Sequence, residues 1–186
     1  IDEFGVPQYH SKLSRSLQSL KQPNVLYPVM DGVFTHIYPD PKDERNTYVS
    51  IEPGLSASLR QSMIEVEKRL LDEAESLDKT ETDDEKKQAF LNFIDEVCAP
   101  ASNHQQGFLK LNLMKKILGS KNGRLHVTAS ELDSIKYLIV RDKIGMGILD
   151  AMVHDPYVED ISCSGLGTVF LEHKIFGSLK TTVDFS

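Results

Sequence analysis

The alternation of apolar and polar residues predicts strands near both ends of the chain and helices between them. Apolar residues occupy every second position on both sides of Asp31-Gly32, and Tyr48 to Ile51 forms a third such run. We therefore expect a small antiparallel sheet over residues 25–53. Near the C-terminus, glycine-containing turns separate three more runs, which is typical of an antiparallel meander: 158–162, 169–173 and 179–185.

Between these regions the apolar residues recur with the period of a helix. From Ser56 onward leucine and methionine occupy every third or fourth position, which favours a packed helical bundle. Two threonines, each followed three residues later by a glutamate, fit the capping box, in which the hydroxyl accepts from the third helical N–H and the glutamate reaches back. Helices are predicted to begin after Thr82 and Thr128, with others over 108–118 and 147–153.

These elements predict an α+β protein with three parts. Residues 1–24 are polar with a weak helical spacing, so we expect an arm or a short helix. Residues 25–128 are expected to form the hairpin or small sheet and a helical subdomain. Residues 129–186 are expected to begin a second antiparallel sheet domain. Its last run reaches Ser186 in the middle of an unfinished sheet, so we expect a piece of a longer protein.

The composition excludes several classes of protein. With 186 residues, 40% of them hydrophobic and 26% charged, the chain has an ordinary globular composition. No apolar run approaches the roughly 20 residues that cross a bilayer, so we expect no membrane insertion. Cys98 and Cys163 form no Cys-x-x-Cys motif, which indicates a reducing compartment.

The net charge of −7 arises entirely from residues 65–96. One interpretation is a solvated helical face, and the other is a docking surface for a basic partner. The candidate docking residues lie at the start of this segment: Glu65, Glu67, Asp72 and Glu73. The chain has no cluster of lysine and arginine, which argues against nucleic-acid binding.

The chain has no recognisable catalytic or metal-binding motif. A phosphate-binding loop needs the spacing Gly-x-x-x-x-Gly-Lys followed by serine or threonine, and no stretch of the sequence matches it, Gly145-x-Gly147 included. The six histidines are far apart, so no metal site is expected. Asp155-Pro156 is interpreted as the end of a helix rather than as part of a carboxylate–histidine group. Cys163 is expected to be a small buried apolar residue in a strand.

Residues 137–185 carry a specific sequence pattern. It comprises YLIVRDKIGMGILDAMVHDPYVEDISC from residue 137, VFLEHK from residue 169 and Gly177-x-Leu179-x-Thr181. This pattern resembles the N-terminal domain of the type II/IV secretion-system ATPases. The form EDISC, together with the upstream YPV from residue 27 and HIYPDP from residue 36, is most similar to the archaeal branch that drives pili, archaella or secretion.

The resemblance implies a hexameric motor at the cytoplasmic face of the cell membrane. In that family a PAS-like N-terminal sheet lies beside a RecA-like domain, ATP binds between them, and domain movement acts on a polytopic membrane platform protein. The Walker motifs that bind ATP and Mg²⁺ belong to the RecA-like domain. This chain has neither motif, so no family catalytic residue is carried over and we expect no hydrolysis by the chain alone.

Two sets of residues are further candidates for contacts. Arg141 and Lys174 are predicted to contact nucleotide or a neighbouring subunit, unless they form ion pairs with adjacent acids. Tyr38 with Asp40 and Lys42 forms a proline-stiffened loop that loses little entropy on binding, or is simply a strand connection.

Two functions remain open from the sequence. The first is a non-catalytic N-terminal module of a secretion or pilus assembly ATPase, which contacts neighbouring subunits and docks on the platform protein. The second is a free-standing adaptor that binds a protein partner through its acidic helices.

Overall fold

The computed structural model describes residues 4–54, 56–73, 82–100 and 123–185. The chain divides into two compact units. The sheet unit combines Ile1–Pro53 with Met146–Ser186, and the helical unit comprises Gly54–Gly145. The sheet unit is therefore built from two segments that are separated in the sequence by the whole helical unit.

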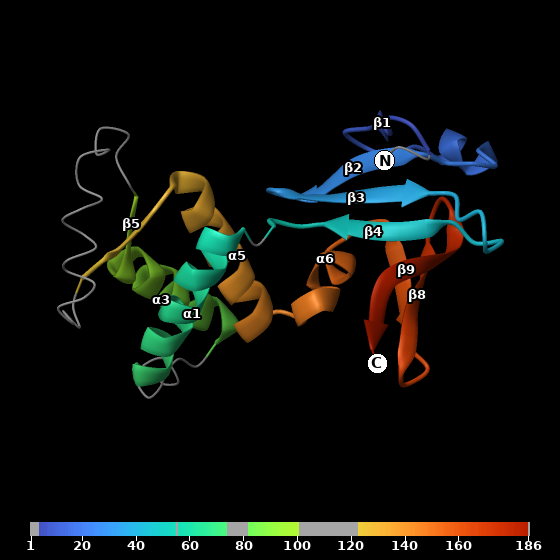
Figure 1. Ribbon diagram of the computed structural model, residues 1–186. Coiled ribbons are helices and arrows are strands. Elements are labelled where there is room, and N and C mark those ends of the chain that lie inside the picture. Colours follow the sequence, from blue (N-terminus) through green and yellow to red (C-terminus); the bar gives the residue numbers. More distant parts are fainter. Residues whose placement is uncertain (1–3, 55, 74–81, 101–122, 186) are drawn as a thin grey trace. The chain divides into compact units, whose positions relative to one another are not determined.

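The sheet unit contains one mixed sheet with the strand order β1-β2-β3-β4-β9-β8-β7 (Figure 1). The unit also holds two 3₁₀ segments, η1 (Arg15–Ser19) and η2 (Gly147–Leu149), and the short helix α6 (Asp150–Val153). The strands are β1 (Gln8–Tyr9), β2 (Val25–Met30), β3 (Val33–Tyr38), β4 (Thr47–Ile51), β7 (Val158–Ser162), β8 (Gly167–His173) and β9 (Gly177–Phe185).

The antiparallel strands predicted over residues 25–53 are confirmed. β2 and β3 are joined by the two-residue turn Asp31-Gly32, with Met30 opposite Val33. Gly32 has a φ of +72°, a backbone conformation that glycine adopts without the steric cost of a Cβ. β3 then pairs antiparallel with β4 over the length of both strands. The small N-terminal sheet thus follows from local turn chemistry and alternation.

The C-terminal strands form the predicted antiparallel meander, β7 with β8 and β8 with β9. The two sets of strands meet where β4 and β9 pair in parallel, with Thr47 opposite Lys180 and Tyr48 opposite Thr181. The Lys180 N–H donates to the Asn46 carbonyl across this β4–β9 junction, at 3.0 Å. The sequence predicted two separate sheets, because pairing between distant strands leaves no local pattern.

One apolar core lies within the sheet unit and draws on both segments. Tyr27, Ile37 and Tyr48 from the N-terminal strands are fully buried together with Leu171 and Leu179 from the C-terminal strands. Met152 of α6 belongs to the same core. Burial of these side chains from water supplies the main driving force for assembling the unit.

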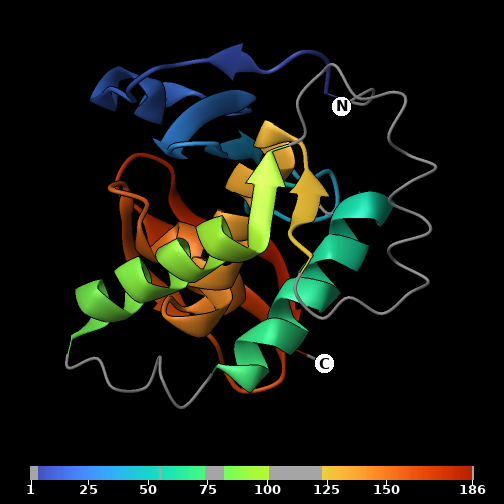
Figure 2. The same ribbon diagram turned by 90° about the vertical axis from the view of Figure 1, so that its left-hand side faces the viewer.

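The helical unit contains α1 (Ala57–Asp72), α3 (Asp83–Val97) and α5 (Ala129–Lys143). It also has a two-stranded parallel sheet of β5 (Cys98–Pro100) and β6 (Leu125–Val127), seen side by side in Figure 2. Both predicted capping boxes are present and precede α3 and α5. The three helices share a core that includes Val66, Ile94 and Ile139.

The structure refines the predicted organisation of this α+β protein. A helical bundle is not confirmed, and the helix predicted over 108–118 lies outside the described residues. The compact units also group the chain differently from the predicted ranges 25–128 and 129–186. Residues 129–143 belong to the helical unit because Ile135, Leu138 and Ile139 pack into its core. Residues 25–53 share a unit with the C-terminal strands.

The capping box of α5 provides a test of local helix stability. Thr128 Oγ1 accepts from the Glu131 N–H at 3.2 Å, and the Glu131 carboxylate accepts from the Thr128 N–H at 2.9 Å. Thr128→Ala should lower the free energy of unfolding by about 1 kcal/mol, measured by urea denaturation. Ser130→Ala, at an exposed position in the first turn of the same helix, is the control and should cost nothing. An equal loss in both variants would contradict the assignment.

Candidate functional site

The most unusual feature of the sheet unit is a buried cluster of polar side chains. We call it the Asp155 cluster, and each of its members is at most 3% exposed. Tyr27, Thr35 and Tyr48 come from β2, β3 and β4, Asp155 follows α6, and His173 ends β8. Buried polar groups are stable only when they are hydrogen-bonded, so each contact within the cluster bears on the fold.

The carboxylate of Asp155 accepts hydrogen bonds from both segments of the sheet unit. Its Oδ2 accepts from the Tyr27 hydroxyl at 2.6 Å and from the Tyr48 hydroxyl at 2.9 Å. Its Oδ1 accepts from the Tyr157 N–H at 2.9 Å. Thr35 Oγ1 lies 2.9 Å from the Tyr48 oxygen and 3.4 Å from Oδ2, so its single proton is best placed on the Tyr48 oxygen. The carboxylate is thus satisfied by hydroxyl and amide donors.

The contacts of His173 fix its tautomer. Its Nδ1 lies 3.2 Å from the Ile175 N–H and 3.3 Å from the Phe176 N–H, and both donate to it. The ring proton is therefore on Nε2, which lies 3.2 Å from the Tyr27 oxygen and donates to it. The result is a directed chain of hydrogen bonds from His173 through Tyr27 to Asp155.

Burial controls the protonation of these groups. Desolvation, reinforced by the neighbouring Asp155 carboxylate, raises the pKa of Tyr27 and of Tyr48 far above the ordinary range, so both hydroxyls remain donors. Desolvation, with a smaller contribution from the Lys174 charge, lowers the pKa of His173 to about 4. The imidazole is therefore neutral at pH 7. This agrees with its hydrogen bonds, because Nδ1 can accept from the Ile175 and Phe176 N–H groups only when it carries no proton.

The Asp155 cluster is suited to holding the fold together rather than to acting on a substrate. Its members are closed to solvent, so a ligand cannot reach the carboxylate or the imidazole without displacing a strand. β2, β3 and β4 each contribute a side chain that lies within hydrogen-bonding distance of Asp155. The cluster therefore fixes the position of the N-terminal strands relative to the segment after α6.

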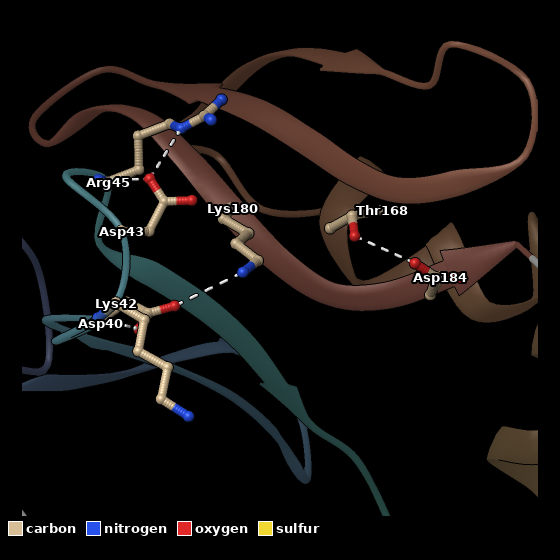
Figure 3. A network of polar contacts seen from close by, with 7 residues as sticks. All are labelled: Asp40, Lys42, Asp43, Arg45, Thr168, Lys180 and Asp184. Carbon is tan, nitrogen blue, oxygen red and sulfur yellow. Dashed lines mark hydrogen bonds and ion pairs between the residues drawn. The ribbon is translucent and has the colours of Figure 1, made fainter.

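The loop between β3 and β4 also crosses the β4–β9 junction, at the surface (Figure 3). Asp40 accepts from the Lys42 N–H at 2.9 Å and lies 3.5 Å from Lys180 Nζ on β9. Arg45 pairs with Asp43 at 3.3 Å, and its guanidinium carbon lies 4.4 Å from the centre of the Phe170 ring on β8. The loop thus links the two segments of the sheet unit as well as connecting two strands.

Three of the predicted docking residues lie in or next to this loop. The Tyr38 ring packs against Phe4 at 5.2 Å and against His36 at 5.0 Å. Asp40 is engaged with Lys42 and Lys180 as described above. Whether Tyr38, Asp40 and Lys42 bind a partner stays a prediction.

The predicted acidic docking residues lie on or just after α1. Glu65 pairs with Arg69 at 2.9 Å, and Glu67 lies 3.5 Å from Lys143 of α5. Asp72 ends the helix, and Glu73 is its C-cap. Surface ion pairs of this kind contribute little to stability. These four carboxylates therefore remain candidates for partner contacts.

Arg141 and Lys174, the two cations predicted to contact nucleotide or a neighbouring subunit, belong to different compact units. Arg141 Nε lies 2.7 Å from the carboxylate of Asp142. Lys174 Nζ donates to the Pro156 carbonyl. A role in contacting nucleotide or a neighbouring subunit stays a prediction for both residues.

The described part of the chain was predicted to hold neither a metal site nor a membrane-spanning helix, and its side chains and helices can be compared with both expectations. No group of three or more histidine, cysteine, aspartate or glutamate side chains there is placed to share a metal ion. Within the same residues, no helix combines the length and apolar character that crossing a membrane requires.

Sequence reasoning did not find the Asp155 cluster. Asp155 was interpreted as a helix end, and it does follow α6, but its side chain is buried among tyrosines. A signal was present at Tyr27 and Thr35, which occupy inward positions of their strands although each carries a hydroxyl. A buried hydroxyl needs a partner. The partner itself is more than a hundred residues away, so the sequence does not indicate it.

The prediction for Cys163 was wrong. The residue is exposed and follows β7 instead of lying within it. The strand ends at Ser162, and Cys163 Sγ lies 3.0 Å from the Gly165 carbonyl in the following turn. Cys98, by contrast, is buried in the helical core.

Comparison with known proteins gives two relatives in Methanocaldococcus jannaschii. The uncharacterized protein MJ0900 is 30% identical over 180 residues, which cover 96% of this chain and 32% of that protein. The uncharacterized protein MJ1288 is 40% identical over 50 residues, which cover 26% of this chain and 20% of that protein. The chain thus spans about a third of the length of the first relative. No protein-family model matches the chain.

The neutral state of buried His173 makes the stability of the sheet unit dependent on pH. An unfolded histidine titrates near pH 6.5, whereas burial lowers the pKa of His173 to about 4. The unfolded state therefore binds more protons between these values, and stability present above pH 6.5 is lost as the pH falls toward 4. The loss should be on the order of 3 kcal/mol, measured by urea denaturation at several pH values.

An NMR titration of the imidazole resonances tests the same assignment directly. His173 should remain neutral down to about pH 4. His126→Gln, which removes an exposed histidine from β6, is the control and should leave the titration of the His173 resonances unchanged. Titration of His173 near pH 6.5 would contradict the account.

Proposed function

We propose that this chain is a non-catalytic N-terminal module of a hexameric secretion or pilus assembly ATPase. The observation that carries the proposal is the specific pattern over residues 137–185, which resembles the N-terminal domain of that family. In support, this stretch contains the second half of α5, the short helix α6 and the meander β7–β9, and the three strands lie close to the ranges predicted from the sequence. The match over about a third of a longer relative is compatible with a module of a larger protein.

The mechanical role draws support from the packing of the sheet unit. A module that transmits domain movement has to resist deformation, which a close-packed interior provides. The core of the sheet unit combines side chains from both segments, and the Asp155 cluster adds directed hydrogen bonds between them. In this proposal the module moves as a body when ATP binds beside it.

The remaining chemistry is assigned to other parts of the assembly. ATP and Mg²⁺ would be bound by a RecA-like domain carrying the Walker motifs that this chain lacks. The partners would be that domain, neighbouring subunits and a polytopic membrane platform protein. The module would then lie in the cytoplasm at the inner face of the cell membrane, without inserting into it.

The carboxylates on and just after α1 are the proposed contact with the platform protein. Glu65, Glu67, Asp72 and Glu73 present carboxylates along or beside one helix, and such a surface complements a basic loop. The ion pairs of Glu65 and Glu67 are partly exposed, so a stronger basic partner can compete for these carboxylates.

Charge reversal on α1 tests the docking surface. Glu67→Lys combined with Asp72→Lys should reduce capture by the cytoplasmic loops of the cognate platform protein about tenfold or more, because attraction is replaced by repulsion. The loss should weaken as salt is raised. Circular dichroism checks that both variants remain folded.

The matched control changes net charge by the same amount in the other unit. Glu159 and Glu172 are exposed on β7 and β8, and Glu159→Lys with Glu172→Lys should leave capture unchanged. Equal loss in both double variants would indicate a response to overall charge alone. A wild-type chain that does not bind the platform loops would contradict the proposed function itself.

A further inference from the structure

The pairing of strands in the sheet unit is extensive within each segment and short between them. β3 is paired with β4 from Phe34 to Tyr38, and β8 with β9 from Gly167 to His173. Across the β4–β9 junction, by contrast, the register covers Thr47 with Lys180 and Tyr48 with Thr181. The β1–β2 pair inside the first segment is equally short, but the junction is where the two segments are joined. Separating the two segments therefore breaks few backbone hydrogen bonds.

The chain connectivity coincides with this line. The strands β1–β4 form one half, which is continuous in sequence, and α6 with β7–β9 forms the other. The two halves are connected covalently through the helical unit. No hairpin crosses the junction, so the halves can part without losing their internal strand pairing. Local opening of this kind costs less than global unfolding.

The contacts that oppose parting are unequal. At the surface, the Asp40–Lys180 pair at 3.5 Å is partly exposed, and such pairs are weak. In the interior, Tyr27 and Tyr48 from the first half donate to the Asp155 carboxylate of the second half. Hydrogen bonds to a buried carboxylate are strong, and breaking these two removes the hydroxyl donors of Oδ2 until water enters.

We infer that the sheet unit opens along the β4–β9 junction into two preformed halves, and that the Asp155 carboxylate is the polar group that, together with the shared apolar core, holds it closed. Opening separates the Lys180 N–H from the Asn46 carbonyl while strand pairing inside each half persists. The apolar core shared by the two halves also opposes opening, and the Asp155 hydrogen bonds add to it. This inference stands on the strand register and the cluster geometry, and it does not rest on the proposed function.

Hydrogen exchange of individual backbone amides, followed by NMR under native conditions, tests the inference. The Lys180 amide reports on the junction because it donates across it. Amides of β3 and β8, each of which lies between two strands of its own half, are the internal controls. In the full chain with Asp155→Asn, exchange at Lys180 should accelerate about tenfold or more, with little change at the control amides.

A second pair of variants keeps the test decisive if Asp155→Asn does not fold. Tyr48→Phe removes one donor to the carboxylate and should accelerate Lys180 exchange in the same selective way. Tyr38→Phe removes a hydroxyl from a half-buried tyrosine outside the cluster and should not. Equal acceleration at β3, β8 and Lys180 would mean that the cluster affects global stability alone. That result, or no change at Lys180, would overturn the inference.

Discussion

The sheet unit depends on how one buried carboxylate is satisfied. Asp155 is 3% exposed, and a carboxylate in such a place is costly unless donors surround it. The donors are the hydroxyls of Tyr27 and Tyr48. Both tyrosines precede the helical unit in the sequence, whereas Asp155 follows it. Neither partner is satisfied without the other. The cluster therefore favours one alignment of the two segments over others that would bury a similar apolar area.

Local features of the fold could be predicted because their causes are local. The turn at Asp31-Gly32 and the capping boxes at Thr82 and Thr128 each depend on a few consecutive residues, and all three are present. The parallel pairing of Thr47 with Lys180 depends on residues more than a hundred positions apart. Alternation predicts that a segment forms a strand, but it does not indicate which strand pairs with it. For this reason the sequence predicts separate N-terminal and C-terminal sheets, whereas the structure has one sheet that contains both sets of strands.

The same division applies to the candidate site. Charged residues such as Asp40 and Glu67 can be singled out from the sequence, yet their partners Lys180 and Lys143 come from other elements. Asp155 was assigned a local role, and its long-range role became evident from the arrangement of the strands. The proposed function rests on the sequence pattern over residues 137–185. Most of that pattern lies in the C-terminal segment of the sheet unit, which the Asp155 cluster bonds to the N-terminal strands.

A double-mutant cycle between Tyr27 and Asp155 tests the central claim most directly. The free energies of unfolding of Tyr27→Phe, Asp155→Asn and the double variant give the coupling between the two side chains. We expect a coupling of about 1 to 3 kcal/mol, because the hydroxyl donates to a buried carboxylate. The same cycle with Tyr38→Phe should be additive. Additivity for Tyr27 and Asp155 as well would contradict the claim that this contact holds the two segments together.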